Sequence, residues 1–243
     1  ISSKDSIYNK GIGIFRRAST DMSSAMIGND ESRLRDVLEN LNNPDYQFFP
    51  VYVSKMDYIG HYFGTGSSET FTALKEVDEQ IYNFIEDAKM INEEVKIILC
   101  GDHGMTDISE RIDIEKKLKD SFKEEIILNK LKYFIDSTLI RFWFKDESIR
   151  AKLKVFLHEN FISFGDIVDY KDYEEKGIPG NKMYGDMIFL CQSGVIISPD
   201  FFNSNRDLKG MHGYTPKGES DFGFCMVIKN KGERLTIEKP ADL

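Results

Sequence analysis

The chain has 243 residues, 41% hydrophobic and 30% charged, which is enough to bury a full core and too apolar for a disordered protein. Its net charge of −9 argues against a nucleic-acid duplex as the main partner, because no basic stripe is present to displace counterions. No apolar run approaches the roughly 18 residues that a membrane-spanning helix needs, so we expect no membrane span in this chain.

The first half of the chain predicts an α/β arrangement. Polar residues 1–28 are expected to be irregular, and Asn29 or Asp30 can cap the helix that follows. We expect a helix over residues 31–41 and a buried strand over residues 47–53. A long helix that begins after Ser67 or Ser68 is expected over residues 68–91, and a second buried strand over residues 95–100. A strand, a helix and a strand in this order predict a right-handed crossover between parallel strands.

The second half changes character after Asp113. We expect a Lys/Glu-rich helix there, and then strands and a helix over residues 138–144, 147–159 and 162–168. Four further strands are expected over residues 187–191, 195–198, 222–229 and 234–237. The compact unit over residues 121–181 is interpreted as an inserted α+β subdomain, and residues 1–120 and 182–243 as the α/β core.

Three of the four histidines, His61, His103 and His212, have a glycine beside them, which scattered surface histidines do not show. Asp57 lies four residues before His61, so one helical turn would place both side chains on the same face. Asp102 and His103 follow a predicted strand, at the edge where ligands gather in α/β sheets. Each histidine alone would be interpreted as structural, as His158 near a helix end still is, but together they predict a metal site.

The motifs around these residues resemble a known family. The segments are KMDYIGHYFG (residues 55–64), GDHGM (residues 101–105) and MHGY (residues 211–214). In order and approximate spacing they are similar to three metal motifs of the alkaline phosphatase superfamily, in its type I phosphodiesterase and nucleotide pyrophosphatase branch. The resemblance implies an α/β fold with a mostly parallel sheet flanked by helices.

The resemblance also implies roles for single residues. Asp57, His61 and His212 would hold one metal ion, and Asp102 and His103 would contribute to a second. Imidazole and carboxylate ligands suit both zinc and manganese, and zinc is the expected metal because histidine is plentiful among the ligands.

The family's nucleophilic threonine or serine, with its aspartate, has no clear counterpart in the sequence. Ser19, Thr20, Asp21 and Ser23 do not follow an apolar strand and lack the surrounding pattern. We therefore expect the nucleophile upstream, in a longer protein of which this chain is an inactive fragment.

The function implied is hydrolysis of phosphodiesters or nucleotide pyrophosphates through a two-metal site and a covalent phospho-enzyme. The alternatives are a phosphomonoesterase, a phosphonate hydrolase or a mutase of the same superfamily, or a non-catalytic metal-binding domain. The expected partner is a small phosphate ester, and the oligomeric state is open. Cys100, Cys191 and Cys225 lie in or beside apolar runs and are expected to be buried, reduced thiols, which favours the cytoplasm.

Overall fold

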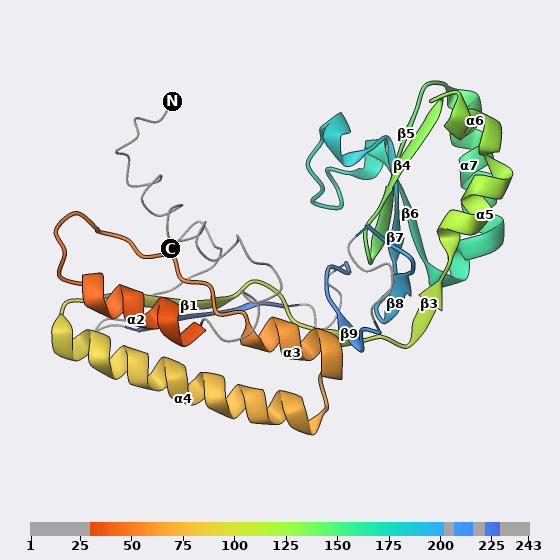
Figure 1. The fold of residues 1–243 in the computed structure, drawn as a ribbon. Coiled ribbons are helices and arrows are strands. Elements are labelled where there is room, and N and C mark those ends of the chain that lie inside the picture. The colour runs from red at the N-terminus through yellow and green to blue at the C-terminus, as the bar shows by residue number, and fades with distance from the viewer. Residues whose placement is uncertain (1–29, 202–206, 216–221, 229–243) are drawn as a thin grey trace. The chain divides into compact units, whose positions relative to one another are not determined.

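The structure of the protein is a computed structural model, which describes residues 30–201, 207–215 and 222–228 (Figure 1). Its contacts divide the chain into two compact units. The first unit comprises Ile1–Gly60, Gly66–Asp102 and Gly223–Leu243, and the second comprises His61–Thr65 and His103–Phe222. Each unit is described by itself below.

Two helices and a strand pair make up most of the described first unit. The elements are α2 (Asp30–Asn40), the start of α3 (Lys55–Phe63), α4 (Ser68–Ile91), β1 (Ile97–Gly101) and β10 (Phe224–Ile228). Helix α2 packs against α4 (Figure 1), and the side chains buried in these two helices are Leu34, Val37, Ala73, Val77 and Ala88.

The two helices expected in this unit are confirmed within a residue or two. Helix α4 begins after Ser67, whose hydroxyl oxygen accepts the N–H of Thr70 at 3.0 Å, as an N-cap does. Its apolar stripe is only partly covered, since Val77 is buried while Leu74 is half exposed.

The expected parallel crossover in the first unit is wrong. Residues 47–53 form no strand, and Phe48 is 71% exposed. Pro50 has no N–H to donate to a sheet, which explains why the apolar character of this stretch did not lead to pairing. Strand β1 is confirmed at residues 97–101, but it pairs antiparallel with β10, and Ile98 is 46% exposed where burial on both faces was expected.

The second unit is built on a four-stranded antiparallel sheet with the strand order β4-β5-β7-β6. These strands are β4 (Leu131–Ile135), β5 (Leu139–Phe144), β6 (Gly165–Asp169) and β7 (Met187–Cys191). The helices of this unit are α5 (Ile114–Ser121), α6 (Lys123–Ile127) and α7 (Glu147–Phe161), with short 3₁₀ turns at Ile162–Phe164, Tyr170–Asp172 and Lys182–Tyr184. Helices α5 to α7 line one face of the sheet (Figure 1).

Four further strands of the second unit form two short pairs. Strand β2 (Thr106–Asp107) pairs antiparallel with β9 (Gly210–Met211). Strand β3 (Glu110–Ile112) pairs with β8 (Val195–Ile197), and this is the one parallel pair among the described strands. The mixed α/β class is therefore confirmed, whereas a mostly parallel sheet is not what the described strands form.

The core of the second unit joins one face of this sheet to the helices. Phe142, Leu153, Leu157 and Phe189 are fully buried in it. Successive side chains along β5 point to opposite faces of the sheet: Phe142 enters the core, whereas the neighbouring Trp143 is partly exposed and its indole N–H donates to the Lys182 carbonyl at 2.7 Å.

A buried ion-pair cluster ties α7 to β6. Asp169 is 5% exposed, and its carboxylate contacts both the Arg150 guanidinium and the Lys154 ammonium group. Burial by itself would raise the pKa of Asp169, but the hydrogen bonds and charges of Lys154 and Arg150 outweigh it and hold that pKa below its usual value.

Some of the elements expected from the sequence differ from those of the structure, and others lie outside the described residues. The strand β4 was not expected, and the strand predicted over residues 162–168 begins three residues later. Residues 1–28 and the strand predicted over 234–237 lie outside the described residues. The division into a core and an insertion at residues 121–181 stays a prediction.

The three cysteines differ from one another in burial. Cys191 is buried, as expected, but Cys100 and Cys225 are exposed, so the expectation of a buried thiol is wrong for these two. The apolar runs around them form β1 and β10, and both residues lie at exposed positions of that strand pair. Among the described residues, no cysteine is in a disulfide bond.

Candidate metal site

Helix α3 carries two of the predicted ligands. Asp57 lies in its first turn and His61 in its last, four residues apart and therefore on the same face. The start of α3 is fixed by Asp30, a 6% exposed carboxylate that accepts the N–H groups of Ser54 and Lys55 at 3.0–3.1 Å and binds Arg33 at 2.6 Å. Asp30 was expected at most to cap its own helix, but it supplies an N-terminal cap to α3 instead.

The end of α3 is fixed by Lys209 and Gly210, which lie just before the third motif. The N–H of Lys209 donates to the His61 carbonyl at 2.7 Å, and His61 Nδ1 lies 2.8 Å from the Gly210 carbonyl oxygen. With Nδ1 protonated, that carbonyl accepts its hydrogen and Nε2 keeps the lone pair that a metal ion needs. The histidine ring is therefore oriented by the backbone.

Glycine ends helix α3 for a steric reason. Gly64 follows the last helical residue with φ of +81°, and a Cβ there would lie 2.9 Å from an Asp107 carboxylate oxygen. The same carboxylate accepts the N–H of Thr65 at 2.6 Å. A side chain at residue 64 would therefore displace the contact that holds the end of the helix to β2.

His212 is placed by β9 and the turn that follows it. Met211 is buried in the core, as expected, and β9 pairs with β2. Gly213 then takes φ of +88°, and its carbonyl accepts the Thr138 hydroxyl at 3.0 Å. The half-buried imidazole between these two fixed residues is thereby held in place.

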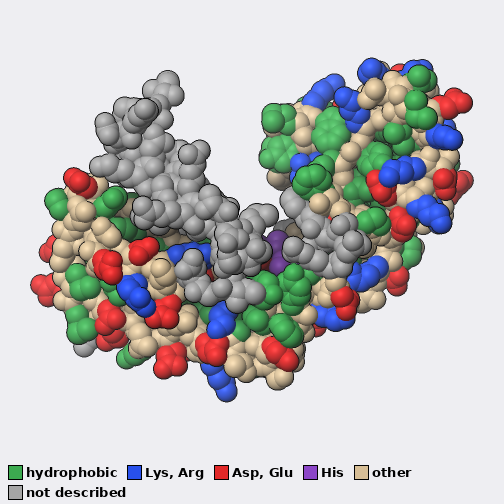
Figure 2. Space-filling view, viewed as in Figure 1, with side chains coloured by type: hydrophobic (Ala, Val, Ile, Leu, Met, Phe, Trp, Pro, Cys, Tyr) green, Lys and Arg blue, Asp and Glu red, His purple; other side chains and the backbone are tan. Residues whose placement is uncertain are grey.

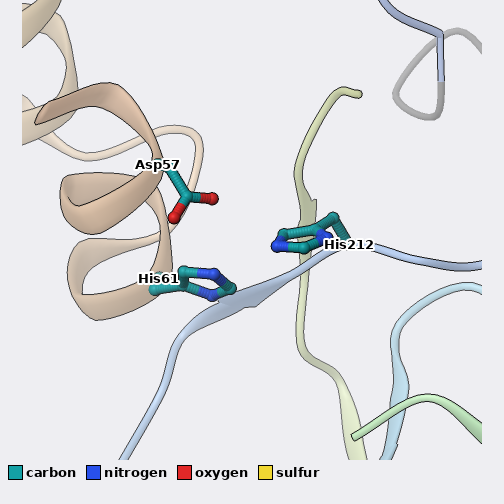
Figure 3. A group of neighbouring side chains, drawn as sticks. All are labelled: Asp57, His61 and His212. Atoms are coloured by element: carbon teal, nitrogen blue, oxygen red, sulfur yellow. The ribbon is translucent and has the colours of Figure 1, made fainter. Parts of the chain in front are cut away.

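Three of the five predicted ligands lie together. One ligand atom each of Asp57, His61 and His212 lies within 4.8 Å of the others, and the three half-buried side chains point toward one another (Figure 3). The rings of His61 and His212 have centroids 5.0 Å apart. One carboxylate and two imidazoles are a donor set that suits zinc with a coordination position left open.

The other two predicted ligands lie at the end of β1 but are not part of that group. His103 stacks on His212 with centroids 3.7 Å apart, and its Nδ1 lies 2.9 Å from the Gly104 carbonyl oxygen. Asp102 is exposed, and its charge acts on Tyr52. Partial burial, followed by the charges of Asp57 and Asp102, raises the pKa of the Tyr52 phenol, so both carboxylates act on one tyrosine.

Residues 19–23, searched as a source of the nucleophile, lie outside the described residues. The structure adds to the predicted set two positioning groups that the sequence did not indicate, the Asp30 carboxylate and the Gly210 carbonyl. An acidic residue before a helix signals a cap, but nothing in the sequence tells which helix it caps. A backbone carbonyl leaves no trace in the sequence.

The surroundings of the site carry mixed charge. Figure 2 shows acidic and basic side chains interspersed on the visible face. No described helix combines the length and apolar composition that a bilayer crossing requires.

A family model and a related protein both match this chain, and both are phosphodiesterases. The sequence model of the type I phosphodiesterase / nucleotide pyrophosphatase family matches residues 3–215. Over 84 residues the chain is 36% identical to venom phosphodiesterase CdcPDE of Crotalus durissus collilineatus, a match that covers 32% of this chain and 10% of that protein.

Solved structures show the same fold at low identity. An inactive variant of murine ectonucleotide pyrophosphatase/phosphodiesterase 5, in complex with AMP, aligns with a TM-score of 0.66 and 19% identity over 83% of this chain and 52% of that one. A mutant of the alkaline phosphatase PafA aligns with a TM-score of 0.56 and 14% identity over 93% of this chain and 45% of that one. The chain thus spans about half the length of these solved structures.

Proposed function

This chain belongs to the type I phosphodiesterase / nucleotide pyrophosphatase family, in the alkaline phosphatase superfamily, and on that premise we propose that it supplies the metal ligands of a phosphodiester or nucleotide pyrophosphate hydrolase. The observation that carries the proposal is the convergence of Asp57, His61 and His212 within 4.8 Å. The two motifs that carry these side chains lie about 150 residues apart in the sequence, so the fold and not local sequence brings the side chains together.

The proposed first ion is held by Asp57, His61 and His212, and the second is held in part by Asp102 and His103. The carbonyl of Gly210 supports this assignment, because it leaves His61 Nε2 as the ligand atom. Stacking of His103 on His212 supports a position of the second motif beside the third. Zinc suits the histidine-rich donor set, and manganese is the alternative metal.

When bound, two such ions would lower the pKa of the nucleophile and neutralise charge on the phosphoryl oxygens. The protein's own residues orient the ligands: the Asp30 carboxylate fixes the start of α3, and Gly213 fixes the turn after His212. The proposed reaction passes through a covalent phospho-enzyme on a threonine or serine hydroxyl.

The substrate class is proposed from the family and from a relative. The family is defined by phosphodiesterases and nucleotide pyrophosphatases, and the related murine protein is in complex with AMP. A small phosphate ester bearing a nucleoside is therefore the proposed substrate.

Metal binding tests the proposal directly. The purified chain is stripped with chelator, reloaded with zinc, dialysed and analysed for bound zinc per chain. We expect bound zinc in the wild type and loss of at least one ion in His212→Ala. His158→Ala is the matched control, because His158 is exposed on α7 and should not change the stoichiometry. Unchanged stoichiometry in His212→Ala, with the fluorescence of Trp143 unaltered, would reject the assignment.

Turnover tests the second part of the proposal. We expect the 243-residue chain to hydrolyse neither bis-p-nitrophenyl phosphate nor p-nitrophenyl phosphate, because the family's nucleophile motif has no clear counterpart in it. A form of the protein that contains the family's nucleophile motif should hydrolyse the diester faster than the monoester. Preference for the monoester or for a phosphonate would favour the corresponding superfamily alternative, and zinc binding without any turnover in such a form would favour a non-catalytic domain.

A further inference from the structure

Two exposed thiols face each other across the strand pair of the first unit. Cys100 in β1 is the direct cross-strand partner of Cys225 in β10, and their Sγ atoms lie 3.4 Å apart. Both side chains are exposed, and 125 positions separate them in the sequence. The contact is therefore created by the fold and not by local sequence.

We propose that Cys100 and Cys225 are a modification site: the two thiols form an intramolecular disulfide when they react with a small disulfide oxidant such as oxidised glutathione. The proposal does not depend on the metal site or on hydrolase activity.

The backbone already has the spacing that such a bond needs. Directly opposite residues in an antiparallel pair have Cα atoms about 4.5 or 5.5 Å apart, and disulfide-bonded cysteines span about 4.4–6.8 Å. Bond formation therefore requires rotation of the two side chains and no change in strand register. The register is fixed by five consecutive pairs, from Ile97 with Ile228 to Gly101 with Phe224.

The chemistry balances with the named oxidant. One thiolate attacks a sulfur of the glutathione disulfide, which releases one glutathione thiol and leaves a mixed disulfide on the protein. The second protein thiol loses its proton and attacks the protein sulfur of that mixed disulfide, which releases the second glutathione thiol. Two protein thiols are oxidised to one disulfide, and one glutathione disulfide is reduced to two thiols.

Cys191 provides an internal contrast. It is 3% exposed in the core of the second unit, and burial raises the pKa of its thiol to about 12. The pKa of the Cys225 thiol is also raised, first by its hydrogen bond with Cys100, so exposure makes the contrast. The oxidant can reach the exposed pair but not the buried Cys191, which should stay reduced.

The proposed disulfide lies next to the second motif in the sequence. Cys100 precedes Gly101 and Asp102 at the end of β1, so the new bond would tie this end of the strand covalently to β10. Backbone amides of Phe224–Ile228 should then exchange more slowly with solvent than in the reduced protein.

The test uses the full chain, purified reduced, freed of metal with chelator and incubated with oxidised glutathione. We expect the wild type to lose two of its three thiols and two hydrogen atoms of mass while staying monomeric, and peptide mapping should link the Cys100 peptide to the Cys225 peptide. Cys191→Ser should form the same link. Cys100→Ser and Cys225→Ser should each carry one glutathionyl group on the remaining exposed thiol and form no internal bond.

Three results would overturn the proposal. These are three retained thiols, separate glutathionylation of Cys100 and Cys225 in the wild type, and disulfide-linked dimers as the main product. Oxidation in urea serves as a further control, because the unfolded chain should lose the selectivity and give links to Cys191 as well. If the folded and unfolded chains gave the same mixture of links, the strand register would not be what selects the pair.

Discussion

Each of the two units is stabilised internally by a different kind of contact. In the second unit, side chains such as Phe142, Leu157 and Phe189 are fully buried between the sheet and α7. In the described first unit, β1 and β10 contain no buried residue, and a polar network around Asp30 joins α2 to the start of α3. The comparison teaches that the position of Asp57 depends on the polar network, whereas Met211 of the large apolar core helps to place His212.

The largest effect is expected from truncation in the apolar core. Phe189→Ala should destabilise the second unit by about 3–5 kcal/mol, since a fully buried ring leaves a cavity. Phe224→Ala in β10, where the ring is 57% exposed, should cost less than about 1 kcal/mol. Urea unfolding followed by circular dichroism measures both, and Trp143, the single tryptophan, reports on the second unit. Equal losses would break the distinction between the units.

The buried charge of the second unit should rank next. Asp169→Asn removes the carboxylate that Arg150 and Lys154 share, and we expect a loss of about 3 kcal/mol at pH 7 because two cations lose their buried partner. Its pKa is lowered in the folded state, so the stabilisation is present above the ordinary value of about 3.9 and is lost as the pH falls through the folded-state pKa.

Urea midpoints measured from pH 7 down to pH 3 check this sign. The difference between the wild type and Asp169→Asn should be constant near neutrality and shrink below about pH 4. A difference that grew on acidification would contradict the ion-pair explanation.

The polar network of the first unit should show a smaller and more local effect. Asp30→Ala removes the acceptor of the Ser54 and Lys55 N–H groups, and we expect the start of α3 to open more readily by about 2 kcal/mol. Hydrogen exchange of these two amides is the measurement. Asp36→Ala is the control, since Asp36 is exposed on the same helix α2. Faster exchange in both variants would show a general loosening of α2 and not the loss of a cap.

The smallest effect concerns the surface ion pair between Lys55 and Glu76. Their side chains are 34% and 52% exposed, so Glu76→Gln should change stability by less than about 0.5 kcal/mol. The small difference should vanish in high salt, which screens exposed charges. A large salt-resistant loss would show that the pair helps to fix α3, and the role assigned to Asp30 would then have to be shared.

The sequence named residues that the structure brings together, but it did not predict which strands pair. The motif residues Asp57, His61 and His212 were named from spacing and resemblance, and the structure brings them together. The strand expected at 47–53 is absent and β4 was not expected, because apolar character shows that a segment is to be buried but not what covers it. The roles of the five residues as ligands stay predictions that the zinc measurement addresses.

What the sequence by itself determined is local. The helices α2, α4 and α7 follow from a period of 3.6 residues, and Ser67 and Asp146 cap α4 and α7 within one turn, so these hydrogen bonds close inside the segment that encodes them. Only the tertiary structure decided which strands pair, that Asp30 caps α3, and that Cys100 faces Cys225. The contact of Asp30 with Lys55 joins residues 25 positions apart and that of Cys100 with Cys225 joins residues 125 positions apart, and no local pattern specifies a partner at such distances.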